Sequence, residues 1–277
     1  MSKYEHIKNL QDAEFRRLTG VKKATFEHML NVYEQALHSS KKVSGRPPSL
    51  SLADQLLMML EYNREYRTYF HISQSYGLSE SNAYRCIKRA EVLLLRSGQF
   101  SLPGRKALQS ADTDYQIVIV DATESRIERP KKKQRDYYSS KKKQHHLKAQ
   151  VIINQLDGRF IATAFARGRE HDFKIFKKSR TRVSKQILLL GDTGYQGIQE
   201  LLPNVLTPIK ASKNYPLTKS EKKENAELSS VRVKVENALA FIKRFKVFST
   251  RYRNRRRRFG LRFNLFAAIC NYEIALN

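Results

Sequence analysis

The chain has 277 residues, enough to bury a hydrophobic core and to form about two domains. Its 53 Lys and Arg residues against 26 Asp and Glu residues give a formal net charge of +27, which favours a polyanionic partner. A hydrophobic content of 40% excludes a disordered chain, and the apolar runs are too short to cross a bilayer, so a nucleic acid is the predicted partner and a membrane is not.

The two cysteines carry little functional information. Cys86 and Cys270 lie in apolar helical contexts without Cys-x-x-Cys spacing, which argues against a zinc site or a disulfide. The first residues also lack the hydrophobic core of a signal peptide. A reducing compartment is therefore expected.

The amino-terminal part is predicted to be helical. Apolar residues recur at spacings of three and four over residues 3–40, which predicts one or two helices, with Thr25 as a candidate N-cap. The polar stretch 39–48 ends in two prolines, which cannot continue a helix and therefore predict a linker or arm.

A helix-turn-helix is predicted over about residues 51–96. Helices are expected at about 52–64, 68–76 and 79–95, with Ser79 as the N-cap of the third. This third helix exposes three candidate DNA-binding side chains, Arg85, Lys88 and Arg89. A plain three-helix bundle gives the same pattern, and the basic charge favours DNA binding. Residues 1–105 are expected to form the helical DNA-binding region and to fold alone.

Beyond a second linker at 99–114, the apolar pattern changes from helical to strand-like. Three strands, a helix, a fourth strand and then further helices form the order of a ribonuclease-H-like domain, here over residues 112–277. The predicted fold is therefore α/β: a mixed-sheet catalytic domain, with helices on both faces, preceded by the all-α region. The expected strands are 116–122, 146–154, 159–165 and 186–190, and the expected helices are 172–178, 219–226, 229–246 and 263–275.

Three acidic residues are the candidate catalytic and metal-binding residues. Asp121 ends the apolar run 116–121, Asp192 ends the run 187–192, and Glu236 lies inside a predicted helix. Hard oxygen ligands at strand ends suit two Mg²⁺ (or Mn²⁺) ions, which activate water and stabilise a leaving oxygen at a phosphodiester. Taken singly, each residue could equally be a loop cap or a solvated surface charge.

Cations close to these acids are candidate DNA-binding residues. Arg232 and Lys243 lie on nearly the same helix face as Glu236, where they either hold DNA phosphates or form ordinary helix pairs. Asp172 could be mistaken for the second metal ligand, but we interpret it as the cap of the helix that begins there.

The segment 129–148, which we call the basic loop, holds nine Lys or Arg residues and a single Asp. It is predicted to grip the DNA backbone, and Tyr137 and Tyr138 are able to stack on an unpaired base. Solvated charge is the alternative interpretation. The proposed backbone contacts are Lys131, Lys132, Lys133, Lys141, Lys142 and Lys143.

Several local motifs resemble one known family. Gly45-Arg-Pro47, Tyr76-Gly-Leu-Ser79, Val120-Asp-Ala-Thr-Glu124 and Gly191-Asp-Thr-Gly-Tyr-Gln-Gly197 are similar to those of bacterial insertion-sequence transposases of the DDE type, in the Harbinger-like group that includes the insertion-sequence-five family. The resemblance implies that Asp121, Asp192 and Glu236 form a metal-binding triad. The resemblance is incomplete at Ser229, because related insertion-sequence transposases have a tyrosine at this position of the signature around the glutamate.

This resemblance implies a DNA transposase, cytoplasmic and associated with the bacterial nucleoid. It would bind the terminal inverted repeats of an insertion sequence, cleave the DNA ends by metal-assisted hydrolysis and join the 3′-hydroxyl to target DNA. Bringing two ends together implies a homodimer or a higher homo-oligomer. One alternative is an endonuclease of the same fold without strand transfer, and another is a catalytically dead, transposase-derived DNA-binding regulator.

Overall fold

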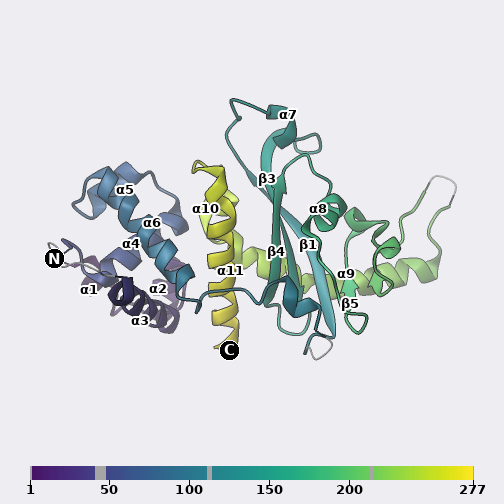
Figure 1. Cartoon of the computed structure of the whole chain (residues 1–277), viewed down its shortest axis with the longest axis horizontal. Coiled ribbons are helices and arrows are strands. Elements are labelled where there is room, and N and C mark those ends of the chain that lie inside the picture. The colour runs from purple at the N-terminus through teal and green to yellow at the C-terminus, as the bar shows by residue number, and fades with distance from the viewer. Residues whose placement is uncertain (1, 41–47, 111–113, 213–214, 277) are drawn as a thin grey trace. The chain divides into compact units, whose positions relative to one another are not determined.

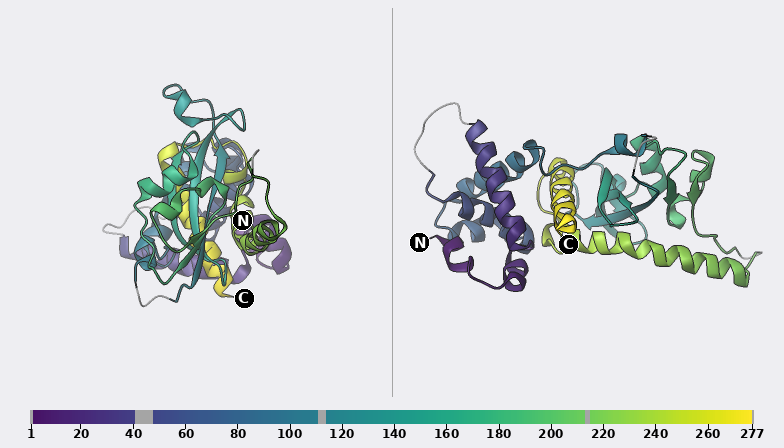
Figure 2. Two further views of the ribbon diagram at one scale, coloured as in Figure 1. Left: turned by 90° about the vertical axis from the view of Figure 1, so that its right-hand side faces the viewer. Right: turned by 90° about the horizontal axis from the view of Figure 1, so that it is seen from below.

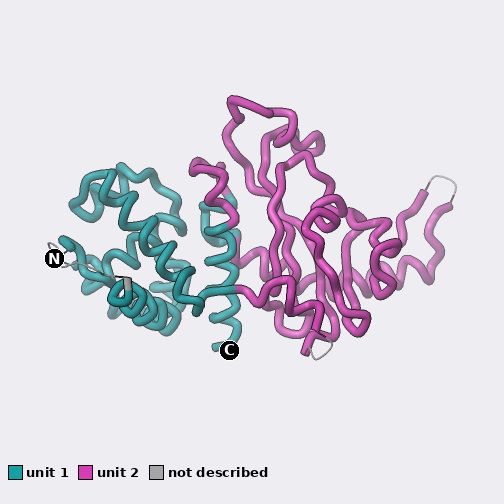
Figure 3. The backbone as a smooth tube through the Cα atoms, in the orientation of Figure 1, with its two compact units in different colours: residues 1–101, 243–249, 261–277 teal, residues 102–242, 250–260 magenta. Residues whose placement is uncertain are grey.

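A computed structural model describes residues 2–40, 48–110, 114–212 and 215–276. It divides into two compact units, coloured separately in Figure 3. Unit 1 comprises residues 1–101, 243–249 and 261–277, and unit 2 comprises residues 102–242 and 250–260. This differs from the expected division into 1–105 and 112–277, because two carboxyl-terminal segments cluster with the amino-terminal helices. Most of the linker predicted at 39–48 lies outside the described residues.

Unit 1 is helical. The amino-terminal part contains three helices before residue 41, one more than the largest number expected, because Gly20 takes a left-handed conformation at φ 87° and ends the second. Thr25 does not cap a helix, since it lies inside the third and donates to Glu273 Oε1 at 3.2 Å. The helices of this unit are α1 (Lys3–Ile7), α2 (Asp12–Thr19), α3 (Lys23–Ser40), α4 (Leu52–Glu65), α5 (Tyr69–Ser75), α6 (Glu80–Arg96), α10 (Lys246–Ser249) and most of α11 (Phe259–Ala275).

Helices α4, α5 and α6 form the predicted helix-turn-helix. Each is capped at its amino end by the side chain of Ser51, Thr68 or Ser79, which accepts a backbone N–H three residues later. The predicted cap at Ser79 is therefore confirmed. Gly77, with φ 62°, forms the turn before α6, and α6 buries a stripe that includes Ala83, Ile87 and Leu94.

The last helix completes unit 1 through a buried ion pair. The Arg262 side chain on α11 is 1% exposed, and its Nε lies 2.6 Å from Oε1 of Glu91 on α6, which is fully buried. A second link joins α11 to the first helices, because Glu273 accepts from Arg16 Nη2 at 2.9 Å and from the Lys22 backbone N–H at 2.6 Å. A buried carboxylate without such a partner is strongly destabilising, so α11 is an integral part of this unit.

Unit 2 is built on a mixed sheet whose strand order is β2-β3-β1-β5-β6, with β4 paired to β3 (Figure 1). The central strand β1 pairs antiparallel with β3 and parallel with β5. This is the predicted α/β, ribonuclease-H-like architecture. The strands are β1 (Ile117–Arg126), β2 (Tyr138–Ser139), β3 (Gln144–Asn154), β4 (Phe160–Arg167), β5 (Leu188–Leu190) and β6 (Val205–Leu206).

Two helices flank this sheet. Helix α8 (Asp172–Ser179) contributes Phe176 to a core that contains Val118 and Val120 of β1. Helix α9 (Lys219–Lys243) runs along another side of the sheet (Figure 2) and is continuous where two helices were expected. In the ranges that the structure describes, no helix is long and apolar enough to cross a membrane.

Candidate active site

The register between β1 and β5 brings the two predicted aspartates, Asp121 and Asp192, to the same level along the strand direction. Ile119 pairs with Leu190 in this parallel ladder, and Asp121 and Asp192 each follow two residues later. Parallel neighbours advance in step, so the two carboxylates lie side by side where β5 ends. Asp121 remains inside β1, opposite Val151 of β3.

Asp121 is a largely buried carboxylate, with a side chain that is 16% exposed. Its Oδ1 accepts from the Ala122 backbone N–H at 2.8 Å, and its Oδ2 lies 3.9 Å from Arg232 Nη2. The pKa of Asp121 is raised from 3.8 to about 6, chiefly by burial and to a smaller extent by the charges of Asp192 and Asp172. The Ala122 hydrogen bond and the charge of Arg232 lower it in part. A nearby cation would therefore stabilise the ionised form of the Asp121 carboxylate.

Gly194 keeps space between two carboxylates. Asp192 Oδ1 accepts its backbone N–H at 2.8 Å. A Cβ at residue 194 would lie 2.9 Å from Asp192 Oδ1 and 3.1 Å from Asp172 Oδ2, so both oxygens face the same small space. The neighbouring Tyr195 is buried, and its pKa is raised by burial and then by Asp172, Asp121 and Asp192. Three carboxylates therefore surround this end of β5.

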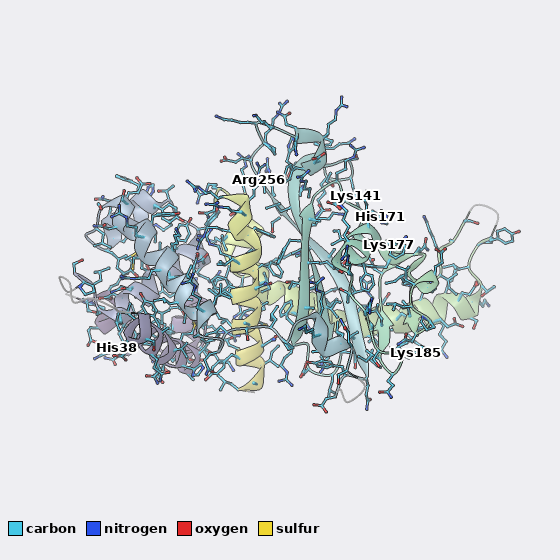
Figure 4. The ribbon with its side chains drawn as sticks, in the orientation of Figure 1. His38, Lys141, His171, Lys177, Lys185 and Arg256 are labelled. Carbon is cyan, nitrogen blue, oxygen red and sulfur yellow. The ribbon has the colours of Figure 1, made fainter. Side chains whose placement is uncertain are left out.

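The interpretation of Asp172 as a helix cap is wrong. Asp172 is the first residue of α8, and the preceding His171, labelled in Figure 4, occupies the N-cap position. The Asp172 carboxylate instead accepts from Lys148 Nζ of β3 at 2.9 Å. Its position in the first turn still suits the positive end of the helix dipole. Asp172 is thus a third acid close to Asp121 and Asp192.

A partly buried charge network next to these acids was missed by sequence reasoning. Glu124 of β1 pairs directly with Lys148 of β3, and Lys148 Nζ lies 3.6 Å from Glu124 Oε1 as well as close to Asp172. His146 Nδ1 lies 3.8 Å from Glu124 Oε2, and burial lowers the pKa of His146. Opposite charges at cross-strand positions were the signal that could have indicated this pair.

Glu236 lies on α9 one turn after Arg232 and is exposed. Among the residues that the structure describes, no three His, Cys, Asp or Glu side chains form a ready-made metal-ligand group. The donor chemistry nevertheless fits divalent metal: two hard carboxylates lie side by side, and one has a buried charge that a cation would neutralise. Arg232 partly supplies this positive charge to Asp121.

The predicted DNA-binding cations are mostly exposed. Arg85 and Lys88 lie on the exposed face of α6, whereas Arg89 donates from Nη2 to Gln55 Oε1 at 2.7 Å and so also fixes α4. Lys243 is exposed at the end of α9. The six lysines of the basic loop that were proposed to contact DNA are exposed: Lys131, Lys132, Lys133, Lys141, Lys142 and Lys143.

A helix-turn-helix unit combined with a ribonuclease-H-like sheet that carries paired aspartates defines a DNA-processing protein of the DDE class. Family models agree: "Helix-turn-helix of DDE superfamily endonuclease" matches residues 48–100, and "DDE superfamily endonuclease" matches residues 120–271. A probable transposase for insertion sequence element IS702 from Microchaete diplosiphon is 44% identical over 274 residues, covering 99% of each chain. The chain therefore belongs to the insertion-sequence transposases of the DDE type.

The raised pKa of Asp121 predicts a pH-dependent stability in metal-free protein. The folded state holds this proton up to pH about 6, whereas an ordinary Asp loses it near 3.8, so unfolding becomes easier as pH rises through that window. The loss amounts to about 3 kcal/mol at most. Asp121→Asn should remove this dependence and be more stable than the wild type near neutral pH. Denaturant unfolding in chelator at a series of pH values measures this, and parallel stability curves for the two proteins would contradict it.

Proposed function

We propose that this protein binds the terminal inverted repeats of an insertion sequence, cleaves the DNA ends and joins the freed 3′-hydroxyl to target DNA. The observation that carries the proposal is the parallel β1–β5 register, which sets Asp121 and Asp192 side by side. Two neighbouring carboxylates, one inside β1 and one just beyond β5, are suited to metal-assisted phosphodiester chemistry.

In this proposal, Asp121, Asp192 and Glu236 hold two Mg²⁺ (or Mn²⁺) ions. The ions, when bound, activate the attacking oxygen and stabilise the leaving oxygen. The Ala122 N–H orients the Asp121 carboxylate, and the Gly194 N–H orients that of Asp192. Glu236 would have to turn its exposed side chain towards the aspartates from its place one turn after Arg232, whose Nη2 lies 3.9 Å from Asp121 Oδ2.

Arg232 is proposed to hold a DNA phosphate beside the aspartates. Its side chain is 18% exposed, and its Nε is buried without a hydrogen-bond acceptor among the described residues. A buried guanidinium N–H that lacks an acceptor is costly, and a phosphate oxygen would satisfy it. Base readout is assigned to Arg85, Lys88 and Arg89, and backbone contacts to the six exposed lysines of the basic loop. Synapsis of two DNA ends requires at least a homodimer.

The test of this function is to incubate the protein with its flanking genomic DNA and Mg²⁺ and to map cuts. We expect cuts at the element ends, and joined products when a pre-cleaved end and target DNA are supplied. Cutting without joining would favour an endonuclease, and specific binding without cutting would favour a regulator.

Glu236→Gln tests whether Glu236 or Asp172 is the third acid that acts with Asp121 and Asp192. It should keep affinity for the ends and lose cutting by a factor of at least about 10², because it removes the charge that holds the second ion. Asp172→Asn is the matched comparison and should reduce cutting less, since its carboxylate is already bound to Lys148. The opposite order of effects would remove Glu236 from the triad and put Asp172 in its place.

A further inference from the structure

The basic loop borders an open cavity that the proposed chemistry does not use. Its volume is about 630 Å³, and it is formed around β2 and α7 (Gln134–Tyr137), and α7 is labelled above β3 in Figure 1. Three arginines line it: Arg129, Arg135 and Arg169. Tyr138, His145, Ser140 and Gln134 complete the lining. The volume lies within the range of about 300–1,000 Å³ that is typical of ligand sites.

The two tyrosines of the loop have different roles. Tyr137 is half-buried, with the guanidinium of Arg167 5.5 Å from its ring centre and that of Arg256, labelled in Figure 4, at 4.6 Å. These cation–π contacts make Tyr137 an anchor of the loop. Tyr138 lies in the cavity wall, is 37% exposed and has its ring edge-on to His145 at 5.4 Å. Of the two rings, Tyr138 is therefore the one that a ligand can contact.

The cavity wall is held in place by the fold. Arg129 Nε donates to Gln134 Oε1 at 2.9 Å, and the Arg169 backbone N–H donates to Asp136 O at 3.1 Å. Gly168 allows this approach, because a Cβ there would lie 2.6 Å from Tyr137 O and 2.8 Å from His146 O. The hydrogen bond to Gln134 restrains the Arg129 guanidinium, which therefore loses less side-chain entropy when it binds an anion.

We propose that this cavity binds one unpaired nucleotide of the DNA substrate, with the base against Tyr138 and the phosphate among Arg129, Arg135 and Arg169. An exposed ring inside a concave site suits a base outside the helical stack, whereas a duplex backbone needs cations alone. Arginine presents paired donors that match phosphate oxygens. The inference rests on the proposed function only in taking DNA as the substrate.

The experiment measures binding of the full-length protein to two short DNA duplexes in chelator, so that no cutting occurs. One duplex is fully paired, and the other carries a single unpaired nucleotide. The wild type should bind the second roughly 10-fold more tightly, as expected for one base stacked on an aromatic ring. Tyr138→Ala should abolish this preference, and Tyr138→Phe should keep it, because the ring rather than the hydroxyl makes the contact.

Tyr215→Ala is the control, since Tyr215 is another exposed tyrosine of unit 2, at 79%, and lies outside the cavity. It should keep the preference of the wild type. Equal binding of the two duplexes by the wild type, or a preference that survives in Tyr138→Ala, would overturn the proposal. Cutting at the element ends is measured separately. A Tyr138-dependent preference without cutting would reject the proposed function alone, and cutting without any preference would reject the cavity assignment alone.

Discussion

Asp121→Ala and Asp192→Ala are each expected to reduce cutting of the element ends by at least about 10³-fold, while DNA binding stays measurable. The two residues each follow the last matched pair of the parallel β1–β5 ladder, Ile119 and Leu190, by two positions. Neither residue belongs to the helix-turn-helix of α4, α5 and α6, so recognition of the ends should persist. Cleavage of labelled end DNA with Mg²⁺, together with a binding titration in chelator, measures both quantities.

Asp157→Ala provides the control for this experiment. Asp157 belongs to the same unit but lies in the turn between β3 and β4, where it pairs with Arg159. Its loss should leave cutting close to that of the wild type. Normal cutting by either Asp121→Ala or Asp192→Ala would show that the paired strand ends are not the reaction centre.

Arg262→Leu is expected to destabilise unit 1 by about 3–5 kcal/mol, because it removes the positive charge that balances the buried Glu91 carboxylate. The pair is almost fully enclosed, with side chains 1% and 0% exposed, and Arg262 also lies over the Tyr62 ring at 5.7 Å. Urea unfolding followed by helical circular dichroism reports the loss. Specific binding to the element ends should fall with it, since α6 carries both Glu91 and the proposed reading residues.

The double substitution Glu91→Leu with Arg262→Leu tests the cause of that loss. Removing both charges should recover much of the stability, because well-packed apolar groups can replace a buried ion pair at little cost. If the double variant were as unstable as Arg262→Leu, packing around the guanidinium rather than the stranded carboxylate would be the source. If Arg262→Leu alone were as stable as the wild type, the buried pair would not hold α11 in this unit.

The four longest strands, β1, β3, β4 and β5, and the paired aspartates could be predicted from the sequence because both are local signals, whereas the two-residue strands β2 and β6 were missed. Apolar runs that end in Asp121 and Asp192 indicate buried strands, and the structure confirms strands at these places. The extent of β1 was underestimated, since its second half carries polar residues such as Glu124 that a propensity pattern excludes. Those residues are stabilised by partners on β3, which only the pairing register identifies.

Contacts between residues that are far apart in the chain could not be predicted from the sequence. Nothing local distinguishes Tyr137 from Tyr138, and their different roles depend on Arg167 and Arg256, far along the chain. Asp172 similarly has the appearance of a helix cap until the Lys148 contact is known. The assignment of α11 to unit 1 depends on Arg262 and Glu91, 171 residues apart.

Unit 1 is built from segments at both ends of the chain, and this affects when DNA binding can begin. A ribosome makes residues 1–101 first, but the helices that complete this unit, α10 and most of α11, are translated last. A nascent or truncated chain that lacks α11 therefore leaves Glu91 without Arg262 and Arg16 without Glu273, and its helix-turn-helix should be poorly folded. Only a finished polypeptide, with its nuclease sheet already synthesised, should occupy the element ends, so prematurely terminated products should not act as competing inhibitors.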